Sequence, residues 1–334
     1  MAWQGLLGHD AIMRRFQRAA ERARLAGSFL FVGPHGIGKR TFAIALAKTL
    51  LCQHLTPDHF EPCDQCESCR LFPQADQLGI EPVTHPDFFA IAKPEDKSFL
   101  PLELLVGDKD HRGKAGLCFE ISRTPYLGGK KVALIDDADF FNAEAANALL
   151  KTLEEPPTDS LLILLGSSAA KQLPTIRSRC QIVRFHPLSS KNIASILYQR
   201  GLVESLEQGL RVARQAEGSL ETARDMLDDT LEGIRDELLR LFDAKRWDAV
   251  AVAAKVNTFV ESAGKEAPLR RKRLRFLLGC IVDHLHGRLR QTDSHSEEKS
   301  RRAIRQIEHT LDALEQVDRN ANLPFIVDAL FNEL

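Results

Sequence analysis

Short apolar runs alternate with helical repeats over the first 187 residues of the chain. Helical spacing is present in residues 10–27, 40–52 and 142–157, where Asn142 is a good N-cap and Pro156 a stop signal. Strands that alternate with helices favour a parallel α/β sheet. The apolar runs that predict its strands are residues 28–33, 87–92, 130–139, 160–168 and 180–187.

The pattern changes after Pro187, where strand signals give way to short helices separated by Gly201 and Gly218. From about residue 230 onward the spacing is helical throughout, with a loop predicted at the polar residues 291–300. Residues 93–128, which are polar and rich in Gly and Lys, fit no element. We therefore expect three parts: an α/β domain at 1–187, a small helical domain at 188–230 and an all-α domain at 231–334.

The composition is that of a globular protein of two or three domains, with 334 residues, 44% apolar and 27% charged. The net charge of −1 gives no global attraction to nucleic acid or membrane, so any such contact must come from a local patch. No apolar run reaches membrane-spanning length, and the first residues lack the apolar core of a signal peptide. We therefore expect a cytoplasmic protein without membrane contact.

Residues 33–41 read GPHGIGKRT and come close to the phosphate-loop pattern G-x-x-x-x-G-K-[ST]. An apolar run precedes them and a helical repeat follows, which is the context that a phosphate loop needs. Arg40 stands where a Ser or Thr hydroxyl helps hold magnesium, and Thr41 comes one place late. The candidate nucleotide-binding residues are Gly33, Gly36, Gly38, Lys39, Arg40 and Thr41.

A pair of acids follows the apolar run at 130–135. Asp136 is placed to orient magnesium, and Asp137 stands where a hydrolysing ATPase carries a Glu that aligns the attacking water. An Asp side chain is one methylene shorter, and a misplacement of about 1 Å costs on the order of 10²-fold in rate. The alternative is a pair of solvated acids that only ends the strand.

Four of the seven cysteines form the pattern C-x10-C-x2-C-x2-C. Short C-x2-C steps wrap a chain around one ion, and four thiolates leave no open position, so the pattern predicts structural rather than catalytic zinc. The alternative, unliganded buried thiols, is disfavoured by the polar and proline residues between the cysteines. The candidate ligands are Cys52, Cys63, Cys66 and Cys69, which define a zinc module at 52–69.

Two basic segments each admit two interpretations. Arg177 and Arg179 precede the last predicted strand, and either one is a surface ion-pair former or an arginine finger for a neighbouring subunit's γ-phosphate. Sequence spacing alone favours the ion pair. The run RRKRLR at 270–275 is interpreted as the solvated face of a helix rather than a nucleic-acid site, because Leu274 and Leu277 have core spacing.

Together these features resemble the clamp-loader ATPase subunits of bacterial DNA polymerase III. The similarity covers residues 5–188, and NANLPFIVDAL at 320–330 resembles the final collar helix of the family. The segments that carry the resemblance are GPHGIGKRT, the four-cysteine cluster, LIDDADFFNAEAANALLKTLEEPP, LPTIRSRC and HPLS.

The resemblance implies an AAA+ fold, with an α/β P-loop domain, a helical lid at 188–230 and an all-α collar at 231–334 that joins five subunits. It implies structural zinc on the four cysteines and ATP with Mg²⁺ as the ligand of the loop. It assigns Arg179 the role of a finger that reaches the ATP site of the adjacent subunit. It gives Ser167 or Ser168 the role of a polar sensor beside the nucleotide.

Three positions separate this chain from the motor subunits of that family. Motor subunits carry G-K-T-S, D-E and a lid motif G-S-x-R whose arginine touches the γ-phosphate, whereas this chain reads GKRT, DD and GSLE. Glu221 has the opposite charge and repels a triphosphate, although Arg224 follows three residues later and is able to compensate. These departures are closest to the delta-prime branch of the family.

We therefore expect a delta-prime-like subunit that helps load the sliding clamp onto primed DNA, with gamma/tau and delta subunits as partners in a hetero-pentamer. Its own ATP site is expected to be weak or without hydrolysis. The alternative is a short gamma/tau-like motor that hydrolyses ATP with Thr41 and Asp137 in shifted roles. A zinc-containing DNA-binding module is disfavoured by the near-neutral charge, and salt-dependent DNA binding would revive it.

Overall fold

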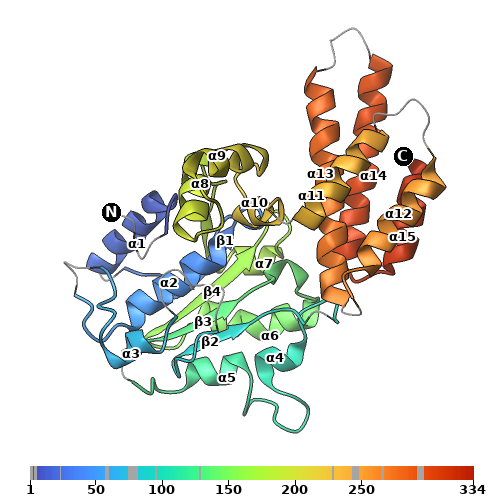
Figure 1. Ribbon diagram of the computed structural model, residues 1–334. Helices are drawn as coiled ribbons and strands as arrows, with labels where there is room; N and C mark the ends of the chain where they lie inside the picture. Colours follow the sequence, from blue (N-terminus) through green and yellow to red (C-terminus); the bar gives the residue numbers. More distant parts are fainter. Residues whose placement is uncertain are drawn as a thin grey trace. The chain divides into compact units, whose positions relative to one another are not determined.

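The computed structural model divides the chain into two compact units, Met1–Pro94 with Phe99–Ala223 and Glu95–Ser98 with Arg224–Leu334. The first unit holds the sheet and the second is helical (Figure 1). The structure describes residues 3, 6–22, 24–56, 60–73, 82–94, 96–127, 129–227, 229–242, 248–264, 267–291 and 297–334.

The first unit is built on a five-stranded sheet in the order β2-β3-β4-β1-β5. Every neighbouring pair runs parallel, which confirms the predicted parallel α/β sheet. Each predicted apolar run contains one strand, and the central strands are buried on both faces, as parallel strands in α/β folds are. The strands are β1 (Ser28–Val32), β2 (Phe88–Ile91), β3 (Lys131–Ile135), β4 (Ser160–Gly166) and β5 (Gln181–Arg184).

Helices cover both faces of the sheet and give it two hydrophobic cores (Figure 1). One core joins alternate strand residues to α1 (Asp10–Glu21) and α2 (Lys39–Leu51). The other core joins the remaining strand residues to α6 (Ala143–Glu154) and to shorter helices. Asn142 caps α6, because its Oδ1 accepts a hydrogen bond from Ala145 N at 2.7 Å, as predicted.

Residues 93–128, for which the pattern predicted no element, contribute two short helices to the second core. These are α4 (Leu102–Val106) and α5 (Leu117–Ser122), with Leu105 and Ile121 buried. Helices of five and six residues are too short to show a helical repeat, which explains the missing prediction. Two further short helices, α3 (Glu67–Arg70) and α7 (Pro174–Arg177), lie beside α2 and α6.

Three short helices follow the sheet: α8 (Ser190–Gln199), α9 (Leu206–Gln215) and α10 (Leu220–Asp225). Helices α8 and α9 pack on each other within the first compact unit, which extends to Ala223. The division into an α/β domain, a lid and a collar therefore stays a prediction, since lid and sheet lie in one compact unit.

The second unit is all-α over its described residues, as predicted. The polar segment 291–300 is a shorter break than predicted, because Gln291 still belongs to α13 and residues 297–300 already belong to α14; residues 292–296 lie outside the described part. Within the described residues, each helix is too short or too polar to cross a membrane. The helices are α11 (Asp229–Phe242), α12 (Ala249–Glu261), α13 (Ala267–Gln291), α14 (Glu297–Asp318) and α15 (Leu323–Glu333).

Candidate functional site

The phosphate loop joins the end of β1 to the start of α2, as the sequence predicts. Gly36 and Gly38 have φ angles of 71° and 92°, in the left-handed region that glycine adopts without strain. Gly38 is the N-cap of α2, so the free N–H groups of the first helical turn face the loop. Such a helix terminus is suited to an anion such as phosphate.

The Lys39 side chain folds back onto its own loop. Its Nζ donates to the carbonyl oxygens of Gly33 and Pro34, both at 2.6 Å, and the residue is buried. Burial lowers the pKa of Lys39, while the nearby carboxylates of Asp136, Asp139 and Glu221 act in the opposite direction. The lysine is therefore already at the mouth of the loop, held by acceptors weaker than a phosphate oxygen.

Arg40 forms an ion pair with the acid that was predicted to orient magnesium. The Arg40 Nη1 atom donates to Asp136 Oδ2 at 2.8 Å. The other carboxylate oxygen, Oδ1, accepts a hydrogen bond from Asp137 N at 3.0 Å. Magnesium prefers octahedral oxygen ligands, usually one or two carboxylates with waters and phosphates. The residues present do not fit a magnesium ion, because a guanidinium replaces the hydroxyl and engages the carboxylate.

Asp137 differs from Asp136 in both backbone and environment. Its φ angle of 56° lies in the left-handed region, which costs a non-glycine residue energy. Burial raises the pKa of Asp137, and the neighbouring Asp136 charge raises it further. The carboxyl group is therefore held less firmly in its ionised form than an ordinary aspartate.

The two candidate sensor serines have different surroundings. Ser167 N donates to Asp139 Oδ2 at 2.7 Å, and Asp139 also accepts from the Gln172 side chain. The Ser167 hydroxyl is buried and finds no hydrogen-bond partner among the described residues. The Ser168 hydroxyl instead accepts from Lys171 N at 3.3 Å. Ser167 is thus the one tied to the acidic segment after β3, through an aspartate that sequence reasoning did not single out.

The segment GSLE lies directly against the phosphate loop. Leu220 N donates to Gly36 O at 2.9 Å. A Cβ atom on Gly36 would lie 2.7 Å from Glu221 Cβ, so only glycine fits this contact. Glu221, whose charge is opposite to that of the motor motif, is therefore next to the loop, as expected. Arg224 belongs to the other compact unit, and its compensating role stays a prediction.

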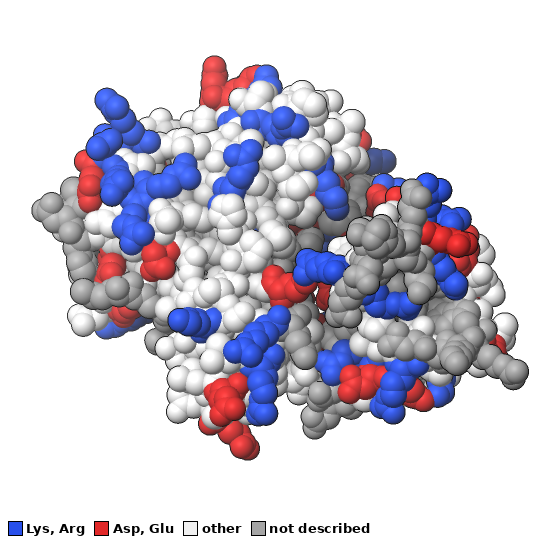
Figure 2. Space-filling model, turned by 90° about the horizontal axis from the view of Figure 1, so that it is seen from above, with Lys and Arg blue, Asp and Glu red and all other residues white. Residues whose placement is uncertain are grey.

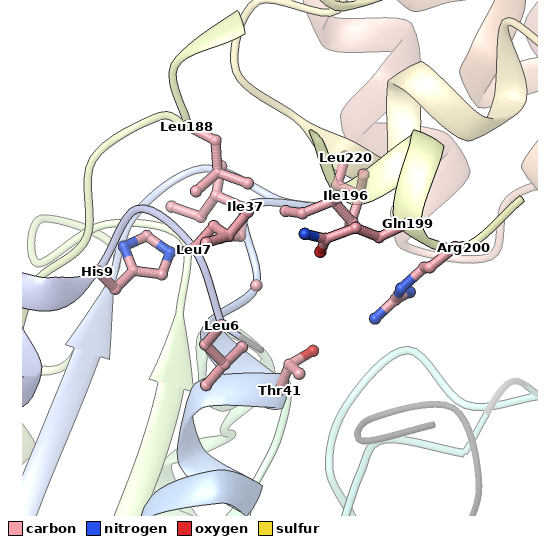
Figure 3. A pocket seen from close by; sticks show the side chains of 11 residues that line it. Leu6, Leu7, His9, Ile37, Thr41, Leu188, Ile196, Gln199, Arg200 and Leu220 are labelled. Atoms are coloured by element: carbon pink, nitrogen blue, oxygen red, sulfur yellow. Dashed lines mark hydrogen bonds between the residues drawn. The ribbon is translucent and has the colours of Figure 1, made fainter. Parts of the chain in front are cut away.

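A cavity of about 210 Å³ opens beside the loop at Ile37, Gly38 and Thr41 (Figure 3). Its walls are mainly apolar and come from four separated segments, residues 6–9, 37–41, 188–200 and Leu220. His9 is fixed at its edge, with Nε2 at 2.7 Å from Ile37 O, and burial lowers the pKa of this imidazole. The other lining residues are the apolar Leu6, Leu7, Leu188, Ile196 and Leu220 and the polar Gln199 and Arg200. Sequence reasoning missed them, because single residues distant in the chain carry no motif.

The four predicted zinc ligands come together at the other end of α2. Their Sγ atoms all lie within 4.8 Å of one another. Tetrahedral zinc with bonds of about 2.3 Å places its ligands roughly 3.8 Å apart, so a small contraction suits the cluster to the ion. Cys52 caps the C-terminus of α2, while Cys66 is the N-cap of α3 and Cys69 lies within it.

The chain also supplies hydrogen bonds to these sulfurs. Cys63 N donates to Cys52 Sγ at 3.4 Å, Cys66 N to Cys63 Sγ at 3.3 Å and Cys69 N to Cys66 Sγ at 3.4 Å. Burial raises the pKa of the Cys63 thiol, but N–H groups of Gln65 and Cys66 and the neighbouring thiols bring it to about 6. Such donors stabilise the thiolate form that binds a metal.

Arg179 lies just after α7 and is held by a carboxylate of α6. Its Nε donates to Glu154 Oε1 at 2.6 Å, and Nη2 contacts the same oxygen. Its Nη1 donates to Thr175 O at 3.1 Å. The side chain is 29% exposed, whereas Arg177 two residues earlier belongs to the exposed residues. The ion pair that spacing favoured is present, and the finger role stays a prediction.

The basic run at 270–275 lies on α13 with its cations turned to partners in the helical unit. Lys272 pairs with Asp225 at 2.8 Å, and Arg275 with Asp318 at 2.5 Å. Leu274 and Leu277 are fully buried. On the visible face of the molecule, basic side chains lie beside acidic ones in many places (Figure 2). These contacts support the interpretation of the run as a solvated helix face.

The family model described as "DNA polymerase III, delta subunit" matches residues 8–189, more than half of the chain. The chain belongs to this family. The matched range contains the whole phosphate loop, the four cysteines, the acidic segment and Arg179. The parallel sheet with helices on both faces, followed by helical parts, agrees with the α/β and all-α architecture that the resemblance implied.

Three curated relatives extend this result. The subunit delta' of Pseudomonas aeruginosa is 38% identical over 159 residues, which is 48% of this chain and 43% of that protein. The subunit delta' of Bacillus subtilis is 29% identical over 232 residues, 70% of this chain and 63% of that protein. The subunit tau of Bacillus subtilis is 30% identical over 246 residues, 72% of this chain and 40% of that protein. The chain thus spans less than two thirds of the length of each.

Proposed function

We propose that the chain is a delta-prime-type subunit of a bacterial DNA polymerase III clamp loader. In a hetero-pentamer with gamma/tau and delta subunits, it helps load the sliding clamp onto primed DNA in the cytoplasm. The family match and the two delta' relatives support the subunit type.

One observation supports the proposal that the chain does not hydrolyse ATP itself but contributes to hydrolysis by its neighbour. Arg40 engages Asp136, the carboxylate that a motor subunit uses for magnesium, so the chain is poorly equipped to hydrolyse ATP itself. Arg179 retains a guanidinium at a partly exposed edge. We propose that Arg179 acts in trans, as an arginine finger at the ATP site of the adjacent subunit. The chain's own loop holds a nucleotide without turnover.

The nucleotide-binding residues of that loop are those of the predicted motif. The backbone of Gly33, Gly36 and Gly38 surrounds the phosphates, and Lys39 exchanges its carbonyl acceptors for phosphate oxygens. Thr41 lies at the wall of the apolar cavity, which is suited to the base or sugar. Asp137 and Ser167 or Ser168 stand near the phosphate end as remnants of the hydrolysis machinery.

We further propose that zinc on the four cysteines is structural. An ion there would fix the C-terminal end of α2 to α3, since Cys52 ends one helix and Cys66 begins the other. Four thiolates complete a tetrahedral shell and leave no position for a substrate. Zinc would supply cross-linking of the polypeptide and take no part in nucleotide chemistry.

The test is a loader reconstituted from gamma or tau, delta and this chain, with clamp loading and ATP turnover as readouts. Arg179→Ala is expected to lower turnover at the neighbouring site on the order of 10³-fold. Arg177→Ala is the matched control, a surface arginine two residues away, and is expected to leave both readouts unchanged. Loss of loading with Lys39→Ala and normal loading with Arg179→Ala would contradict the proposal.

A second candidate is a short gamma/tau-like motor. The intact Lys39, the glycine loop and the similarity to a tau subunit favour it. Steady-state ATP turnover by the isolated chain separates the two functions, because a motor turns over ATP through its own loop and a delta-prime-type subunit does not.

A further inference from the structure

The Arg40–Asp136 pair fills the place where a phosphate loop of this kind holds its metal. Arg40 occupies the sequence position of the magnesium-binding hydroxyl. Asp136 directly follows β3, at the position of the magnesium-orienting carboxylate. The guanidinium and the carboxylate meet at 2.8 Å, across 96 positions of sequence. The two residues that stand at the magnesium-binding positions of the motif are therefore bonded to each other.

In this arrangement both carboxylate oxygens of Asp136 already accept a hydrogen bond. Oδ2 accepts from Arg40 and Oδ1 from the backbone of Asp137. A magnesium ion would have to displace the guanidinium and then lie beside it, with two cations in contact. Like charges at that distance repel, which makes the metal-bound arrangement unfavourable.

The phosphate-binding parts of the loop are nevertheless intact. Gly36 and Gly38 keep the left-handed backbone, Lys39 lies at the loop, and an apolar cavity of about 210 Å³ adjoins it. Arg40 adds a second cation, which is still 44% exposed and thus reachable by a ligand. The Arg40 guanidinium carries a permanent positive charge and several N–H donors, both of which favour phosphate oxygens.

We propose that this loop binds a nucleoside diphosphate free of magnesium, with the Arg40 guanidinium as a built-in cation in place of the metal. The inference deepens the nucleotide-holding part of the proposed function and rests on it. It does not depend on the trans role of Arg179. Asp136 orients Arg40 toward the phosphate side of the loop instead of orienting a metal.

The test measures binding of a fluorescent ADP analogue to the full chain in EDTA and in millimolar Mg²⁺. The natural chain is expected to bind ADP equally well in both buffers. Arg40→Ser restores the motif and frees Asp136, so its affinity is expected to become about tenfold tighter with Mg²⁺ than with EDTA. Arg211→Thr, which removes an exposed arginine on α9, is the matched control and is expected to behave as the natural chain.

A second variant separates the roles of Asp136. Asp136→Asn keeps an oxygen that can accept from Arg40 and removes a negative charge beside the ligand, so it is expected to bind ADP at least as tightly as the natural chain in both buffers. If Asp136 held magnesium, the same variant would lose affinity only in the Mg²⁺ buffer. Electron paramagnetic resonance of Mn²⁺, added with ADP, is expected to show bound metal for Arg40→Ser and none at this site for the natural chain.

Three outcomes overturn the inference. They are a tenfold loss of ADP affinity on removal of Mg²⁺ from the natural chain, Mn²⁺ bound with ADP by the natural chain, or no ADP binding in EDTA. None of these outcomes changes the result expected for Arg179→Ala in the reconstituted loader. A failure of the magnesium-free binding proposal is therefore distinguishable from a failure of the proposed subunit role.

Discussion

Two arginines of the first compact unit, Arg40 and Arg179, are each paired with a carboxylate, but with opposite consequences. Arg40 engages Asp136, a residue of the chain's own candidate nucleotide site. Arg179 engages Glu154, a residue at the end of α6 that belongs to no predicted site. The first contact occupies the carboxylate of Asp136, a group that hydrolysis needs. The second contact occupies no group of a predicted site, and it holds the Arg179 guanidinium at a defined place near the surface.

Under the proposed function, the same residue type closes the chain's own site at Arg40 and serves a neighbouring site at Arg179. Both pairs are partly exposed, with 44% and 25% for Arg40 and Asp136 and 29% and 49% for Arg179 and Glu154. Surface pairs of this kind contribute only about 0–1 kcal/mol each. A multiply charged phosphate from a neighbouring subunit therefore has the strength to draw Arg179 away from Glu154. The Arg40 pair lies at the chain's own phosphate loop, between the first turn of α2 and the end of β3.

The largest expected effect comes from loss of the zinc module. This loss should destabilise the part of the sheet domain that carries Arg40 more than the part that carries Arg179. Cys52 ends α2, the helix that carries Arg40, whereas Arg179 is paired with Glu154 of α6, a helix of the other core. We expect Cys66→Ser, or zinc removal by a strong chelator, to cost about 4 kcal/mol. Such a loss lowers Tm by roughly 8–16 °C. Hydrogen exchange should rise in α2 and α3 before α6 and α7.

Cys118→Ser is the control, since this cysteine lies outside the cluster and should not change the metal content. Metal analysis of the natural chain, purified without chelator, should find about one zinc per chain. Its absence, or equal exchange in α2 and α6 after zinc removal, would contradict the assignment of the module to the α2 side.

The next effect in size is that of Arg179→Lys. The geometry of Arg179 uses Nε, Nη1 and Nη2 together, and a lysine offers a point charge instead of this planar fork. We expect turnover at the neighbouring ATP site of a reconstituted loader to fall on the order of 10²-fold, the usual loss of one transition-state donor. Full activity with lysine would show that charge alone suffices and would weaken the finger assignment.

Glu154→Gln should have a smaller effect in the same assay. The amide keeps an acceptor but loses the charge that holds Nε and Nη2 of Arg179. If Glu154 positions the arginine, kcat at the neighbouring site falls about tenfold, which corresponds to about 1.4 kcal/mol. The KM for ATP and the Tm of the chain should not change. Glu155→Gln is the neighbouring control, and an equal effect there would point to a general charge effect.

Much of the fold was predictable because it depends on local pattern. Each of the five apolar runs contains a strand, and Asn142 caps α6. Both features were predictable because strand formation and helix capping depend on residues that are close together in the sequence. The short helices α4 and α5 were not predicted, because five or six residues show too little periodicity. The polar break after α13 was predicted too long, because polar residues 297–300 begin the next helix.

The site was predictable as a set of residues but not as a set of contacts. The phosphate loop, the cysteine cluster and Arg179 all have short motifs. The Arg40–Asp136 pair joins segments 96 positions apart, and nothing in the local sequence indicates that the arginine turns toward that acid. Likewise the cavity beside Gly38 is lined by mainly apolar residues from segments that are far apart in the chain and meet only in the folded structure.

The smallest expected effect is that of Arg40→Lys, the same substitution as at Arg179. Arg40 reaches Asp136 through a single nitrogen, Nη1, so a point charge can replace most of this contact. We expect ADP affinity without magnesium, Tm and clamp loading all to remain close to those of the natural chain. A large loss with Arg40→Lys would mean that the planar guanidinium itself is needed at the loop. The two arginines would then differ in the ligand they serve and no longer in the geometry they require.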